Sequence, residues 1–101
     1  MVLVVLLTVR PDQIDKFRAY ERQAALVMAR HGGGIERVVE IPSDNEGDPY
    51  REVHIVSFPD EAAYQAYTID PDMANWRALR DASVIRTEIM KGEEGPDYAP
   101  P

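Results

Sequence analysis

The chain has 101 residues, of which 45% are hydrophobic and 29% charged, as in a single globular domain with one core. Its 18 acidic and 11 basic residues give a net charge of -7, which repels phosphate backbones and argues against a nucleic-acid partner. The absence of cysteine excludes disulfides and thiol chemistry and suits a cytoplasmic location. No apolar run is long enough to span a bilayer, so we expect no membrane association.

The first half of the chain predicts a strand, a long helix and a second strand. Residues 2–9 are apolar without alternation, which is typical of a strand covered on both faces. Residues 11–31 have helical periodicity, with Pro11 expected in the first turn and the glycines after His31 expected to end the helix. The expected packing face of this helix carries Ile14, Phe17, Ala24, Val27 and Met28.

Residues 35–42 alternate as an edge strand does, because one of the two faces is largely polar. The two predicted faces are Ile35, Val39 and Ile41 against Glu36, Val38 and Glu40. After an acidic turn, residues 50–58 are apolar on both faces, which predicts a central strand. Its faces are Val53 and Ile55 against His54, Val56 and Phe58.

The second half continues with helical sequence over residues 59–69, interrupted at Asp70-Pro71. Asp70 is an expected N-cap, and Pro71 an expected first residue, of a further helix that ends near Asp81. A last strand spans residues 83–92, with faces Val84, Arg86 and Glu88 against Ile85, Thr87 and Ile89. We expect one domain over residues 1–91 and an acidic, Pro/Gly-rich tail over residues 92–101.

This order, β-α-β-β-α-β, predicts a ferredoxin-like α+β fold: a four-stranded antiparallel sheet with its helices on one face. The first and third strands should be central and the second and fourth should lie at the edges. Two helices cover only one face of such a sheet, yet the central strands are apolar on both. A second copy of the chain is the economical cover, so we predict a homodimer formed by sheet-to-sheet packing.

Three stretches carry a family resemblance: "FRAYERQAALVMARHGG", "REVHIVSFPDEAAYQAY" and "DPDMANWRALRDAS". In these, the chain resembles the dimeric α+β-barrel superfamily and, within it, the family described as domain of unknown function 1330. The resemblance reaches about Met90. Relatives in the superfamily include cofactor-independent monooxygenases, haem-degrading enzymes and small isomerases or dehydratases, and a shared fold does not transfer their chemistry.

The two histidines are candidate acid/base residues. His31 ends the long helix, where it either caps the helix or acts as a proton shuttle beside a cleft; we expect the cap, and the family's His-Gly-Gly ending favours the shuttle. His54 lies on a central strand and faces either the cavity under the helices or the partner subunit. The sequence favours neither orientation.

Glu21 is a third catalytic candidate, because it falls within the apolar arc of the long helix. It is either exposed and paired with Arg18 or partly buried with a raised pKa; exposed pairing is expected, since glutamate is rarely buried without a partner. Tyr20 lies beside it and could line the same space.

Candidate ligand-binding residues are aromatic or cationic. Trp76, Tyr64 and Tyr67 are expected in the core, and in a small barrel they would also line a pocket for a planar ligand. Arg37 could bind a carboxylate. Two distant histidines without metal-ligand spacing predict no metal site, and no phosphate-binding loop or nucleophile elbow is present.

We therefore expect a cofactor-free small-molecule enzyme or ligand-binding protein with a small apolar or aromatic ligand. A non-catalytic dimeric module with a filled interior is the main alternative. Haem binding through His31 or His54, with monooxygenase-like activity, is a third and weaker interpretation.

Overall fold

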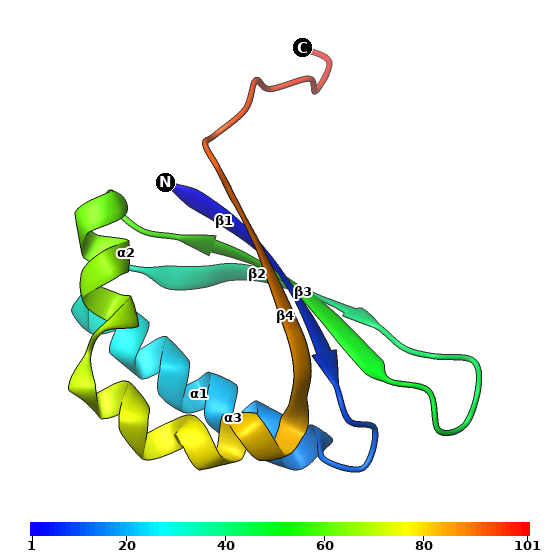
Figure 1. Cartoon of the computed structure of the whole chain (residues 1–101). Coiled ribbons are helices and arrows are strands. Elements are labelled where there is room, and N and C mark those ends of the chain that lie inside the picture. The colour runs from blue at the N-terminus through cyan, green and yellow to red at the C-terminus, as the bar shows by residue number, and fades with distance from the viewer.

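The computed structural model describes residues 1–101 as an antiparallel sheet with helices packed on one of its faces (Figure 1). The elements are β1 (Val2–Val9), α1 (Ile14–Arg30), β2 (Gly34–Ile41), β3 (Tyr50–Ser57), α2 (Glu61–Thr68), the 3-10 helix η1 (Pro71–Trp76), α3 (Arg77–Ser83) and β4 (Val84–Gly92). The strand order is β2-β3-β1-β4. The predicted ferredoxin-like α+β fold is confirmed, with β1 and β3 central and β2 and β4 at the edges.

Side chains cap the starts of α2 and η1, whereas α1 and α3 begin without such a cap. The prediction that Pro11 lies in the first turn of α1 is wrong, because the backbone N–H of Gln13 donates to the carbonyl of Arg10 and closes a turn before the helix begins at Ile14. Asp60 caps α2 by accepting a hydrogen bond from the N–H of Ala63 at 2.8 Å. Asp70 is an N-cap as predicted, but the segment that it caps is a 3-10 helix, followed by α3.

The end of α1 depends on two glycines with different roles. Gly32 has a φ of 74°, in the left-handed region that glycine adopts without a Cβ penalty. Gly33 needs no unusual φ, but a Cβ there would overlap the ring of Phe58. The chain can therefore reverse direction tightly and enter β2 beside the end of β3.

Both edge strands contain a register shift that the sequence pattern did not reveal. Between Ile35 and Arg37 of β2, one extra residue, Glu36, faces a regular step of β3. Ile35 therefore shares the helix side with Val38 and Glu40, and the prediction that it shares a face with Val39 and Ile41 is wrong.

A second shift, next to Thr8 and Val9 of β1, changes the faces of β4. It brings Val84 to the helix side with Thr87 and Ile89, so the predicted grouping of Val84 with Arg86 and Glu88 is also wrong.

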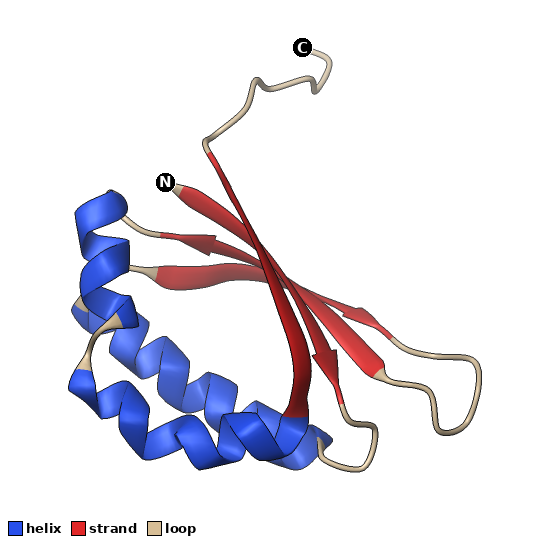
Figure 2. Cartoon of the chain, viewed as in Figure 1, coloured by secondary structure: helices blue, strands red, loops and turns tan.

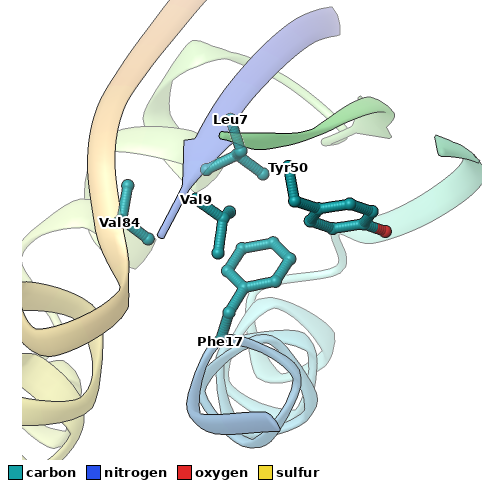
Figure 3. Close-up of a cluster of buried hydrophobic side chains, with 5 residues drawn as sticks. All are labelled: Leu7, Val9, Phe17, Tyr50 and Val84. Atoms are coloured by element: carbon teal, nitrogen blue, oxygen red, sulfur yellow. The ribbon is translucent and has the colours of Figure 1, made fainter. Parts of the chain in front are cut away.

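The helices lie on one face of the sheet (Figure 2), and the buried hydrophobic side chains form the core between these two layers. One cluster joins α1 to the sheet, with Phe17 reaching up to the strands (Figure 3). Its members are Leu7, Val9, Phe17, Tyr50 and Val84. A second cluster lies at the other end of the sheet and consists of Leu3, Met28, Val56 and Phe58. The opposite face of the sheet is covered by no element of the chain (Figure 1).

Candidate functional site

A cavity of about 250 Å³ lies between the two clusters, under the helices. Its floor is the helix side of β1, β3 and β4, and its walls come from α1, α2, η1 and α3. Most of its lining residues are apolar. The exceptions with an acidic or basic side chain are Glu21, His54 and Arg80. This volume is just below the roughly 300 Å³ at which typical ligand pockets begin, so a ligand for it must be small.

The polar centre of the cavity is a line of side chains that starts at Glu21 and continues along β3. Oε2 of Glu21 lies 3.7 Å from Nδ1 of His54. On its other side, Nε2 of His54 donates to Oε1 of Glu52 at 2.6 Å, and the hydroxyl of Tyr50 donates to Oε2 of the same carboxylate. Because residues two apart on a strand share a face, β3 itself aligns Tyr50, Glu52 and His54.

This arrangement settles the orientation of His54: the ring is buried, 3% exposed, and faces the cavity and not the outer face of the sheet. With Nε2 protonated and held by Glu52, the nitrogen left to accept a proton is Nδ1, which faces Glu21. Glu52 therefore fixes both the orientation and the tautomer of the histidine.

The fold shifts the pKa of the Glu21 carboxyl into the neutral range, where the group can both take up and release a proton. Its side chain is only 16% exposed, and it has no hydrogen-bond partner within the chain. Burial raises the pKa of its carboxyl to about 7, with Glu52 adding to the increase and His54 and Arg80 opposing it. The expected exposed pair with Arg18 is wrong, because Arg18 binds Glu40 at 3.2 Å and Glu21 turns to the cavity.

Arg80 of α3 is the cation of the cavity lining. Its Nη2 donates to Oγ1 of Thr87 on β4 at 2.9 Å, which is a contact with a neutral group. The nearby positive charge of Arg80 partly offsets the increase that burial causes in the pKa of Tyr20. The cavity thus holds a titratable carboxyl and an arginine that has no acidic partner.

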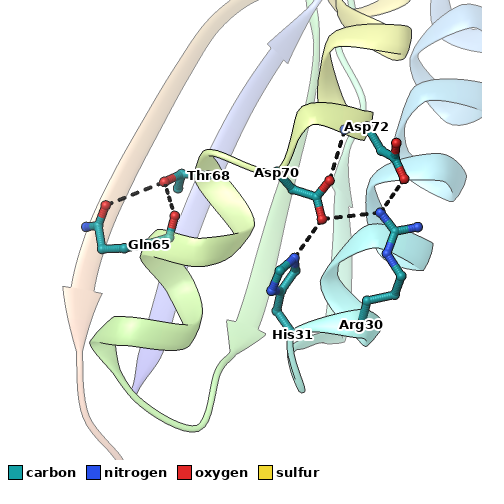
Figure 4. Close-up of polar contacts among 6 residues, drawn as sticks. All are labelled: Arg30, His31, Gln65, Thr68, Asp70 and Asp72. Carbon is teal, nitrogen blue, oxygen red and sulfur yellow. Dashed lines mark hydrogen bonds and ion pairs between the residues drawn. The ribbon is translucent and has the colours of Figure 1, made fainter.

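His31 is not among the cavity-lining residues. Its backbone N–H closes the end of α1, while its side-chain Nε2 donates to Oδ2 of Asp70 at 2.7 Å (Figure 4). Asp70 also accepts a hydrogen bond from Arg30 at 3.2 Å. The pKa of the Asp70 carboxyl is lowered to about 2, and the largest cause is the hydrogen bond from His31. The cluster joins the end of α1 to the start of η1, so the side chain of His31 stabilises the contact between these two helices.

The predicted ligand-binding residues divide into two groups. Tyr20, Tyr64 and Tyr67 line the cavity. Trp76 ends η1 outside the lining, and Arg37 pairs across β2 and β3 with Ile55 on the outer face of the sheet. The structure therefore brings together His54, Glu21 and the three tyrosines, and leaves His31, Trp76 and Arg37 elsewhere.

Sequence reasoning missed Glu52, Tyr50, Arg80 and Thr87. A signal was present for the first two, because they precede His54 at spacings of two and four on a strand. Arg80 also left a signal: it follows Trp76 by four residues, and so lies on the otherwise apolar face of its helix.

The fold and the cavity define a ferredoxin-like α+β domain with a polar centre between its helices and its sheet. The chain belongs to the family described as domain of unknown function 1330, whose model matches residues 3–92. No curated protein matches the sequence. None of the helices has both the length and the apolar character that a membrane span requires, and no three acidic or histidine side chains are grouped as metal ligands.

Solved structures of the same fold include three with low sequence identity. SnoaB, a cofactor-independent oxygenase from Streptomyces nogalater, is 15% identical with a TM-score of 0.59 over 93% of each chain. A protein of unknown function from Rhodopseudomonas palustris is 22% identical with a TM-score of 0.70, covering 94% of this chain and 83% of that one. Rv0793 from Mycobacterium tuberculosis is 14% identical with a TM-score of 0.59, covering 95% and 97%. These likenesses establish the fold.

Proposed function

We propose that the protein binds a small, mostly apolar molecule in the cavity and moves a proton on it through Glu21 and His54. The observation that carries this proposal is the largely buried Glu21 carboxyl, which has no hydrogen-bond partner and lies opposite Nδ1 of His54 inside the cavity. A carboxyl with a pKa of about 7 is half protonated near neutral pH, where a general base and its conjugate acid are both available.

The chemistry that fits is proton transfer at a weakly acidic C–H or O–H bond beside a carbonyl or aromatic ring. Glu21 takes the proton, the electron pair passes to the ligand's oxygen, and the cationic Arg80 lies in the same cavity to stabilise that charge. His54 lies 3.7 Å away to share the proton, with Glu52 behind it. A cofactor-independent oxygenase has a similar fold, so catalysis without a bound cofactor is compatible with this architecture.

Two alternatives receive less support. A non-catalytic module with a filled interior would have no cavity of about 250 Å³ centred on a buried carboxyl and histidine. Haem is too large for that volume, and the histidines do not fit it: His31 is bound to Asp70, and His54 is held between Glu52 and Glu21.

The test is hydrogen–deuterium exchange of phenylacetone in D₂O, followed by proton NMR. This neutral ketone carries acidic C–H bonds between its carbonyl and its ring. We expect the protein to accelerate exchange above the buffer rate, and Glu21→Gln and His54→Asn each to reduce it at least tenfold. Glu36→Gln, an exposed control, should exchange like the unchanged protein. No acceleration, or full acceleration in both cavity variants, would refute the proposal.

We also propose that the protein is a cytoplasmic homodimer joined through the outer face of the sheet, with residues 92–101 as an appended tail. The support is the uncovered apolar surface of that face, where Val39 is 41% and Met90 61% exposed. The cysteine-free sequence agrees with a reducing compartment. Native mass spectrometry should show a dimer that Ile55→Lys, on the outer face, converts to monomer, whereas Leu26→Lys on α1 leaves it intact. A monomeric unchanged protein would exclude this assembly.

A further inference from the structure

Seven of the eleven lysine and arginine side chains have no carboxylate within 4.0 Å, and Arg80 is the one of these seven that lines the cavity. Arg18, Arg30, Arg86 and Lys91 each lie within 4.0 Å of an acidic side chain. Arg80 donates to the neutral hydroxyl of Thr87 and has the neutral hydroxyl of Tyr20 within its reach, which still leaves some of the five N–H donors of its guanidinium free. A half-buried cation that lines a cavity and has spare donors is suited to an anionic ligand group.

Strand register places the groups of the cavity floor at successive levels. Thr87 pairs with Leu7, His54 with Val5, and Val56 with Leu3. Residues two apart on a strand are separated by about 7 Å. Thr87, His54 and Val56 therefore follow one another at successive levels along β1.

Beyond Val56, the ring of Phe58 lies 5.5 Å from that of Tyr64 and 5.4 Å from that of Tyr67. These three aromatic side chains line the apolar end of the cavity. The acid/base pair of Glu21 and His54 thus lies between a cationic end and an aromatic end.

We propose that the cavity takes a small monocarboxylate with an aromatic or branched apolar body, whose carboxylate binds Arg80 and Thr87 and whose body packs against Phe58, Tyr64 and Tyr67. One guanidinium and one hydroxyl match a singly charged planar group, and Glu21 nearby disfavours a second negative charge. The carboxylate subsite stands on Arg80 itself, whereas the placement of a reacting carbon beside Glu21 rests on the proposed function.

The experiment is isothermal titration calorimetry with 3-phenylpropanoate and its uncharged match, 3-phenylpropanamide. We expect the acid to bind about tenfold more tightly than the amide, as a charge-assisted hydrogen bond would give. Arg80→Met should abolish that preference and weaken the amide much less than the acid, and Arg80→Lys should keep part of the preference. Arg77→Met, an exposed arginine on the same helix, is the matched control and should keep all of it.

The amide checks that Arg80→Met still folds with an open cavity, and circular dichroism checks it independently. Equal binding of acid and amide, a preference that survives Arg80→Met, or no binding of either compound would overturn the carboxylate subsite. Glu21→Gln separates the two proposals, because it should retain the preference for the acid while losing phenylacetone exchange. Failure of exchange with an intact preference would therefore refute proton transfer alone.

Discussion

Replacing Glu21 by glutamine should stabilise the protein at alkaline pH and have little effect at acidic pH. In the folded chain, burial raises the pKa of Glu21 to about 7, from an ordinary value of 4.5. The folded state therefore holds a proton that the unfolded state has already released between these two values. Stability falls as the pH rises through this window, because the fold must either keep the proton or bury a charge. Glutamine has nearly the same shape and does not titrate.

The magnitude follows from the size of the shift. A change from 4.5 to about 7 corresponds to about 3 kcal/mol over the whole titration. Between pH 5.5 and pH 8.5, the difference between the two titration curves amounts to about 2 kcal/mol. The side chain is 16% exposed, so solvent screens only a small part of this effect.

Urea unfolding followed by the fluorescence of Trp76, the single tryptophan, measures the effect directly. The free energy of unfolding of Glu21→Gln, relative to the unchanged protein, should increase by about 2 kcal/mol from pH 5.5 to pH 8.5. Glu36→Gln, at an exposed position, is the control and should show a flat difference. A flat difference for Glu21→Gln as well would show that the carboxyl ionises as it does in water, and the account of the cavity would be wrong.

Three further substitutions test the surroundings of the site by urea unfolding. Glu52→Gln should lower the free energy of unfolding by about 1–3 kcal/mol, because an amide has one oxygen and leaves either Tyr50 or His54 without an acceptor. An unchanged free energy of unfolding would show that Glu52 does not accept both hydrogen bonds. Gly33→Ala should cost about 1–3 kcal/mol through overlap with Phe58, while Gly34→Ala, which meets open space, should show no such clash. Asp60→Ala should cost about 1 kcal/mol by removing the cap of α2, and an asparagine there should restore most of it.

The sequence was informative where one local pattern determined the outcome. The apolar faces of residues 2–9 and 50–58 were sufficient to place these strands at the centre of the sheet. Alternation failed in β2 because a single extra residue, Glu36, reverses the phase of the pattern that follows it. Neither apolar nor polar character at that position distinguishes a regular step from a bulge.

The site was predictable only in part, because its chemistry depends on which strand lies opposite which helix. The helical periodicity put Glu21 on the apolar arc, but the general rarity of buried glutamate favoured Arg18 as its partner. The structure supplies His54 instead, from a strand that is distant in sequence. The hydrogen bond from Arg80 to Thr87 likewise appears only when α3 lies beside β4.

The irregularities of β2 and β4 have a consequence for how copies of the chain can associate. An exposed, regular edge strand is a template on which another chain can add a strand, and irregular steps twist such an edge away from pairing. Here both edges carry one such step, at Glu36 and beside Val84, while the two inner strands carry none between them. Open-ended growth of the sheet into fibres is thereby opposed at both borders, whereas the broad uncovered face, on which the proposed homodimer would form, carries no such obstacle.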